Sequence, residues 1–177
     1  MYAGGKNLKK ITTATLILLI TATLTGLSSG LLYAYSCSVN LGLGRLPDRE
    51  YLDAMQSINK EILNPLFFIG FFGALVILPV SCFFNYSRPV SSRFIFLVIA
   101  SLLYAIGVFG VTIFGNVPLN DTLAKANLPA SSAEEISTLR INFEGPWNKL
   151  HTARTIASVI SFVFAVLACL DRSNIGE

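Results

Sequence analysis

The stretch FIFLVIASLLYAIGVFGVTIFGNV, residues 94–117, decides the class of this protein because it contains no charged residue. It exceeds the ~18 uncharged apolar residues that indicate a helix able to cross a bilayer. Two similar stretches precede it, at residues 11–37 and 66–86, and a shorter one follows at residues 155–170. The shorter stretch becomes long enough if its helix begins near Pro146, since an α-helix rises ~1.5 Å per residue.

The pattern predicts a single domain over residues 1–177. Its fold class is all-α, an integral membrane four-helix bundle with spans at about residues 11–37, 65–86, 94–116 and 147–170. The composition agrees, with 53% hydrophobic residues, 13% charged residues and a mean hydropathy of +0.64. Soluble domains carry roughly 25% charged residues, so a soluble globular protein is disfavoured.

The connection between the first two spans predicts an additional amphipathic helix in the first outer loop. Acidic residues suited to a helix start follow Pro47. Apolar residues then recur at steps of three and four, at Tyr51, Leu52, Met55, Ile58 and Ile62. We expect this helix to pack on the outer end of the bundle or to lie in the membrane interface.

Lysine and arginine in the short segments predict the orientation, because these residues resist translocation. Four crossings place one basic set on a single side, namely Lys6, Lys9, Lys10, Arg88, Arg93 and Arg172. We therefore expect a multi-pass protein of the cell (plasma or inner) membrane with both termini in the cytoplasm. The longer polar loops then lie outside, where a functional site is expected.

The expected partners follow from charge and from small residues in the helices. The net charge of +3 comes without a basic run, so no nucleic-acid partner is expected. The lipid bilayer is the predicted surrounding. Gly26, Gly30 and Gly107 allow helices to approach closely, which leaves a homo-oligomer open.

The segment WNKLHTAR, residues 147–154, carries the most informative polar residues. On a helix, Trp147, His151 and Arg154 share one face through steps of four and three. Arg154 is followed by apolar sequence until Asp171, so it must find a partner or extend to the membrane surface. Trp147 alone is equally typical of an interfacial anchor.

The same topology brings further polar residues to the depth of His151. They are Tyr35 at the end of the first span, and the asparagines Asn59, Asn64, Asn116 and Asn120. Each asparagine alone also fits a helix cap or a turn. Together with His151 and Arg154 they predict a pocket for a small hydrophobic or aromatic molecule. We expect Asp121 or Glu144 to supply an acidic hydrogen-bond partner.

No cofactor is predicted, because the usual motifs are missing. Cys37, Cys82 and Cys169 are scattered without metal-type spacing and fit small apolar positions. One histidine cannot supply two haem ligands or a three-histidine zinc site. A metal or haem would have to be held through His151 together with other ligands.

Several segments resemble the DUF1772, or anthrone-oxygenase-like, membrane family across nearly the whole chain. They are GLLYAYS at 30–36, LNP at 63–65, GNVPLN at 115–120 and WNxxHTxR at 147–154. The family's named activity is the oxidation of an anthrone to an anthraquinone with molecular oxygen, without a conventional cofactor. The resemblance implies a site built from one set of residues, namely Asn116, Asn120, Trp147, Asn148, His151 and Arg154.

A catalytic hypothesis joins both lines of reasoning. His151 removes a proton from a phenolic or anthrone-like substrate, and Arg154 with Asn116 or Asn120 stabilises the oxyanion. Trp147 and Tyr35 pack against the ring. The alternative is a non-catalytic membrane module, either a structural subunit or a small-molecule-binding protein.

Overall fold

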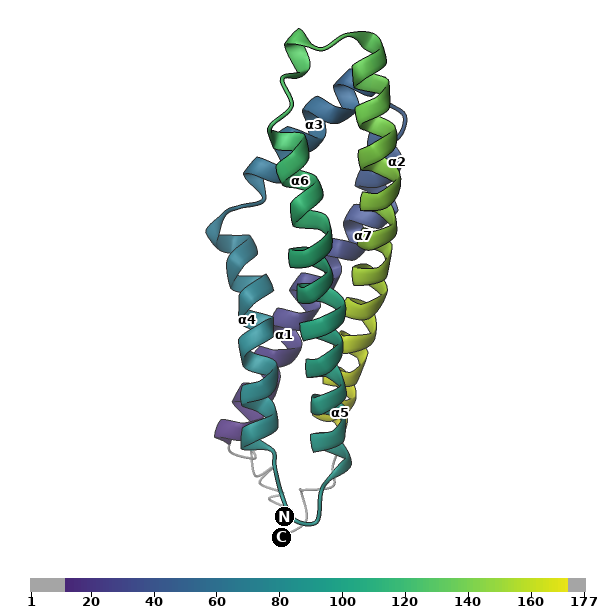
Figure 1. The fold of residues 1–177 in the computed structure, drawn as a ribbon. Helices are drawn as coiled ribbons and strands as arrows, with labels where there is room; N and C mark the ends of the chain where they lie inside the picture. The colour runs from purple at the N-terminus through teal and green to yellow at the C-terminus, as the bar shows by residue number, and fades with distance from the viewer. Residues whose placement is uncertain (1–11, 172–177) are drawn as a thin grey trace, which may run out of the picture.

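The computed structural model describes residues 12–171, and Figure 1 shows that they form a bundle of long helices. In chain order the elements are α1 Thr13–Ala34, η1 Tyr35–Val39, α2 Asn40–Leu43, α3 Asp48–Glu61, α4 Pro65–Phe84, α5 Ser92–Leu102, η2 Leu103–Gly110, η3 Thr112–Asn116, α6 Val117–Ala124, η4 Leu128–Ala130 and α7 Ala133–Leu170. The segments η1, η2 and η3 are π-helical, and η4 is a short 3₁₀ turn. The predicted all-α class is confirmed.

Four continuous helices are long and apolar enough to cross a membrane, at Thr13–Leu43, Pro65–Phe84, Ser92–Ala124 and Ala133–Leu170. The protein is therefore a membrane protein with four candidate spans. Three of these helices run further than the predicted spans, because they continue past the apolar stretch at the end of the bundle where α3 lies. Lys6, Lys9, Lys10 and Arg172, used for orientation, lie outside the described residues.

The last helix does not begin at Pro146 as the sequence suggested. It begins at Ala133, where Ser132 and Glu135 form a capping box: the Ser132 hydroxyl accepts from the Glu135 N–H at 3.2 Å, and the Glu135 carboxylate accepts from the Ser132 N–H at 2.7 Å. This motif satisfies two free donors at the helix start and is a stronger start signal than an internal proline. Pro146 lies inside α7.

The bundle interior combines apolar packing with satisfied hydroxyls. α1 packs against α4 and α7, and α5 packs against α7. Tyr104 is 1% exposed, and its hydroxyl bonds Ser28 Oγ at 2.7 Å and donates to the Phe71 carbonyl at 3.0 Å. A Cβ on Gly107 would lie 2.6 Å from the Ala157 Cβ, so glycine is required for this close helix approach.

Both ends of the described chain lie at the same end of the bundle (Figure 1). Leu18 near the start of α1 and Ala168 near the end of α7 are buried in one cluster with Leu97 of α5. At this end Arg93 Nε donates to the Ala168 carbonyl at 3.1 Å. The helices therefore alternate in direction, as an even number of crossings requires.

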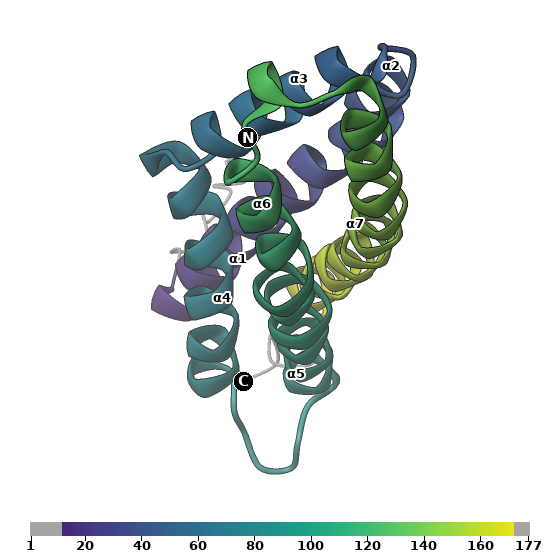
Figure 2. The same cartoon turned by 45° about the horizontal axis from the view of Figure 1, so that its top comes forward.

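The opposite end carries a cap built around α3, and Figure 2 shows α3 lying across the bundle there. The cap has its own apolar core, composed of Tyr51, Leu52, Met55, Leu123, Leu128, Ile136, Phe143 and Trp147. The first three belong to α3, so its predicted amphipathic character is confirmed and its apolar face is turned onto the bundle. Of the two predicted positions, packing on the end of the bundle is therefore the one observed.

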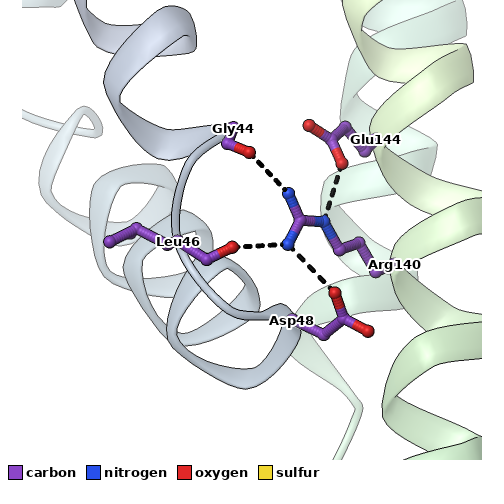
Figure 3. A network of polar contacts seen from close by, with 5 residues as sticks. All are labelled: Gly44, Leu46, Asp48, Arg140 and Glu144. Atoms are coloured by element: carbon purple, nitrogen blue, oxygen red, sulfur yellow. Dashed lines mark hydrogen bonds and ion pairs between the residues drawn. The ribbon is translucent and has the colours of Figure 1, made fainter.

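Arg140 of α7 ties the α2–α3 connection to this cap (Figure 3). Its guanidinium donates to Glu144 Oε2 at 2.8 Å, to Asp48 Oδ1 at 3.0 Å, to the Leu46 carbonyl at 2.6 Å and to the Gly44 carbonyl at 3.2 Å. The Arg140 side chain is only 14% exposed, so these charged hydrogen bonds are partly shielded from water. Arg140 therefore fixes α3 over the bundle.

We expect Arg140→Met to loosen α3 selectively, because Asp48 and the two carbonyls lose their donor. Amide hydrogen exchange in residues 48–61 should accelerate roughly 10- to 100-fold, while exchange in α1 and α4 stays unchanged. Arg45→Met is the matched control, since Arg45 is an exposed arginine of the same connection. Unchanged exchange in α3 of the Arg140 variant would show that the apolar core alone holds the cap.

Candidate functional site

The site begins with three side chains that α7 places in a row. Trp147 and His151 are 3% and 1% exposed, and their rings stack at 5.0 Å with an interplanar angle of 15°. The Arg154 guanidinium carbon lies 5.2 Å from the centre of the Trp147 ring, within cation–π range. One helix face therefore presents a ring, an imidazole and a cation together.

Hydrogen bonds define which nitrogen of His151 carries the proton. Arg154 Nε and Nη2 lie 3.2 and 3.1 Å from His151 Nδ1, and because arginine only donates, Nδ1 must accept. The neutral ring then carries its proton on Nε2, which donates to Ser36 Oγ at 2.9 Å. The Ser36 hydroxyl in turn donates to the Leu32 carbonyl at 3.2 Å. Both imidazole nitrogens are thus engaged.

Two π-helical segments position the partners of this row. In η1 the Asn40 N–H bonds the Tyr35 carbonyl, and in η3 the Val117 N–H bonds the Thr112 carbonyl, each five residues back. The wider turn re-aims side chains, and such segments are frequent at functional sites. Segment η1 carries Ser36 to His151, and η3 carries Thr112 to Arg154, whose Nη1 donates to Thr112 Oγ1 at 3.3 Å.

Aromatic packing and asparagines hold the row in place. The Tyr35 ring lies 5.4 Å from the Trp147 ring and 5.1 Å from the His151 ring. Trp147 Nε1 donates to Asn120 Oδ1 at 2.8 Å, and Asn116 Nδ2 donates to the Trp147 carbonyl at 3.2 Å. These contacts fix the Trp147 ring as one wall of a cavity.

A cavity of about 630 Å³ opens beside this row, within the range of ~300–1,000 Å³ that suits small-molecule sites. Six predicted site residues line it: Tyr35, Asn59, Asn120, Trp147, His151 and Arg154. Most of the remaining surface is apolar, and α4 contributes Phe67, Phe68, Phe71 and Phe72. The Asn59 Nδ2 atom is buried without a hydrogen-bond partner, so a donor remains available there.

Three predicted site residues do not line the cavity. Asn116 lies behind Trp147 and supports its backbone. Asn64 caps α4, where its Oδ1 accepts from the Phe67 N–H at 3.1 Å and its Nδ2 donates to the Glu61 carbonyl at 2.8 Å. Asn148 follows Trp147 directly, and one residue turns the helix by ~100°, so its side chain points elsewhere.

The predicted acidic partners also lie elsewhere. Glu144 pairs with Arg140, and Asp121 lines the cavity without an ion pair to Arg154. Among residues 12–171 no ion pair involves Arg154, so it has no carboxylate to balance its charge. An uncompensated cation on an apolar cavity at the depth of spanning helices favours an anionic or anion-forming ligand.

Sequence reasoning missed two threonines of the site, Thr112 and Thr155. Thr155 Oγ1 lies 3.5 Å from His151 Nε2 and donates to the His151 carbonyl at 2.7 Å. Thr112 precedes Asn116 by four residues, and Thr155 follows His151 by four. The same helical spacing that linked His151 and Arg154 could have identified both residues. Among residues 12–171, no group of three His, Cys, Asp or Glu side chains is placed to hold a metal ion.

Comparison with known proteins identifies one family. A family model described as anthrone oxygenase matches residues 66–164, more than half of the chain. The match includes Thr112, Trp147, His151 and Arg154, whereas Tyr35, on η1, lies outside it. Neither the curated proteins nor the solved structures gave a match.

The inferred tautomer of His151 can be measured directly, because this is the only histidine in the chain. We expect ¹⁵N-histidine spectra of untagged protein in bilayers to show a protonated Nε2 and an unprotonated Nδ1. Ser36→Ala should shift the Nε2 signal, because it removes the acceptor, whereas Ser38→Ala, at an exposed position two residues on, should not. A proton on Nδ1 would contradict the Arg154 hydrogen bonds.

Proposed function

The chain belongs to the anthrone oxygenase family, and on this premise we propose that it oxidises a phenolic, anthrone-like small molecule with molecular oxygen in the cavity. The observation that carries the proposal is the uncompensated Arg154 guanidinium beside His151, at the polar end of an aromatic cavity. This arrangement suits a flat, acidic ring system. The ring would pack on Trp147 and Tyr35, and its oxygen would face Arg154.

The proposed reaction balances without a bound electron carrier. Loss of a proton from the CH₂ group of an anthrone gives an anion whose charge is delocalised onto the opposite oxygen. The carbanion carbon forms a bond to molecular oxygen, and protonation gives a hydroperoxide. Loss of water then leaves a carbonyl, so substrate and O₂ become quinone and H₂O. The substrate supplies all the electrons, and we therefore propose that no cofactor is required.

The geometry refines the role proposed for His151. The lone pair on Nδ1 would have to accept the proton, but it already accepts hydrogen bonds from Arg154. His151 therefore cannot act as a base in this arrangement. We propose that the substrate oxygen draws the guanidinium away, which frees Nδ1 as the general base. Ser36 holds the opposite nitrogen, so the ring stays oriented during the exchange. Arg154 would then stabilise the oxyanion as charge develops.

We expect Arg154→Gln to lower oxygen consumption with an anthrone substrate by about 10²- to 10³-fold, because the oxyanion loses its cation. His151→Asn should lower it by about 10²- to 10⁴-fold through loss of the base. Arg88→Gln, an exposed arginine at the opposite end of the bundle, is the charge-matched control and should retain activity. Unchanged turnover in both site variants, or saturable binding without turnover in the unaltered protein, would favour the non-catalytic binding module.

We also propose that the cavity faces the outside of the cell and that both chain ends face the cytoplasm. Arg88 and Arg93, in and beside the short connection between α4 and α5, support this orientation. In a variant without native cysteines, Asn127→Cys should react with an impermeant maleimide added to intact cells. Ser87→Cys should react only after the membrane is opened. The reverse pattern would invert the topology.

A further inference from the structure

The cavity has two unlike ends. One end is polar and carries Arg154, His151 and Asn120, whereas the wall formed by α4 consists of four phenylalanines. Phe67 and Phe71 stack at 5.0 Å and continue this wall along the helix. A flat ring with an acidic oxygen matches the polar end only. We call the phenylalanine wall the aromatic arm; it is composed of Phe67, Phe68, Phe71 and Phe72. A ligand that consists of the ring alone has no group to contact the aromatic arm.

The aromatic arm reaches the surface that faces the bilayer. On α4, Ile69, Phe72 and Val76 are spaced by three and four residues and are 60%, 42% and 62% exposed. They form the outward stripe of an apolar spanning helix. Phe72 belongs to this stripe and also lines the cavity. On α1, Leu27 and Leu31 are 62% and 43% exposed four residues apart, and Leu31 also lines the cavity.

We propose that the substrate is an amphiphile, a phenolic ring joined to a flexible apolar chain, and not a compact ring system alone. The ring lies at Arg154 and Trp147, and the chain follows the aromatic arm toward the lipid. This inference rests on the proposed function, because it names the substrate class of the same cavity. The ring end is recognised by charge, and the chain end by apolar contact.

The physical argument lies in the surroundings of each end. An apolar chain in the aromatic arm exchanges lipid contacts for aromatic contacts, so it costs little to move there from the bilayer. A polar group placed against the four phenyl rings would gain no conventional hydrogen bond from them, which is expensive at this depth. The ring oxygen, in contrast, gains the Arg154 cation only at the far end. The cavity therefore orients an amphiphile in one direction.

The test uses the only tryptophan of the chain, Trp147, as a reporter at the ring end. The full-length protein in phosphatidylcholine vesicles, which contribute no tryptophan, is titrated without oxygen, so that binding is separated from turnover. Two probes have the same length: para-octylphenol with bromine on the ring, and para-octylphenol with bromine at the chain end. Bromine quenches indole fluorescence on close contact. We expect the ring-brominated probe to quench the Trp147 fluorescence in a saturable way. We expect the chain-brominated probe to displace the ring-brominated probe while quenching Trp147 only weakly.

A pair of variants on α4 tests the chain separately. Phe72→Ser should weaken binding of para-octylphenol by about five- to tenfold, while binding of para-cresol, which lacks the chain, changes by less than about twofold. Phe83→Ser is the matched control on the same helix, because Phe83 is 78% exposed and does not line the cavity. This variant should bind both phenols like the unaltered protein.

Three results would overturn the inference: equal quenching by the two bromine positions, no saturable quenching by the ring-brominated probe, or an equal loss of cresol and octylphenol binding in Phe72→Ser. A failure of the proposed function is distinguishable. It would appear as absent oxygen consumption in a protein that still binds the amphiphile in the expected orientation.

Discussion

A positive charge at apolar depth is the constraint on which the site depends. Arg154 projects from a spanning helix and has no carboxylate partner among the described residues, so its charge is met by an imidazole nitrogen, a hydroxyl and an indole face. In lipid, where water is scarce, each of these groups must be delivered by the protein. The tautomer of His151 follows from that requirement, and the π-helical turn η3 delivers the Thr112 hydroxyl to Arg154.

Two arginines of α7, Arg140 and Arg154, show how similar side chains acquire different roles. Arg140 is neutralised by Asp48 and Glu144 and saturated by two carbonyls, so it acts as a structural tie. Arg154 is only partly satisfied and faces a cavity. Burial of a compensated charge stabilises an arrangement of helices, whereas an uncompensated charge retains binding energy for a ligand.

The cavity combines groups from residues 66–164, which the family model matches, with groups from the residues that precede them. The residues matched by the anthrone oxygenase family supply the polar row on α7 and the aromatic arm on α4. The preceding residues supply walls from α1 and η1, including Tyr35, and a roof from α3, including Asn59. Arg140 and the apolar core of the cap hold α3 in place over the cavity. The contacts that shape the cavity therefore differ from those that orient Trp147, His151 and Arg154.

The sequence by itself determined the four apolar helices, the amphipathic α3 and the shared face of Trp147, His151 and Arg154, because these depend on composition and on local helical spacing. Only the tertiary structure decided that Asn64 caps a helix and that Thr112 meets Arg154. It also decided that Glu144 pairs with Arg140 instead of the site, and that the lone pair of His151 is already occupied. The Thr112–Arg154 pairing joins residues 42 positions apart, so it depends on how helices rotate and stack against one another, which local spacing does not specify. The other three pairings lie within about one helical turn, where spacing allows several partners and the packed surroundings select one.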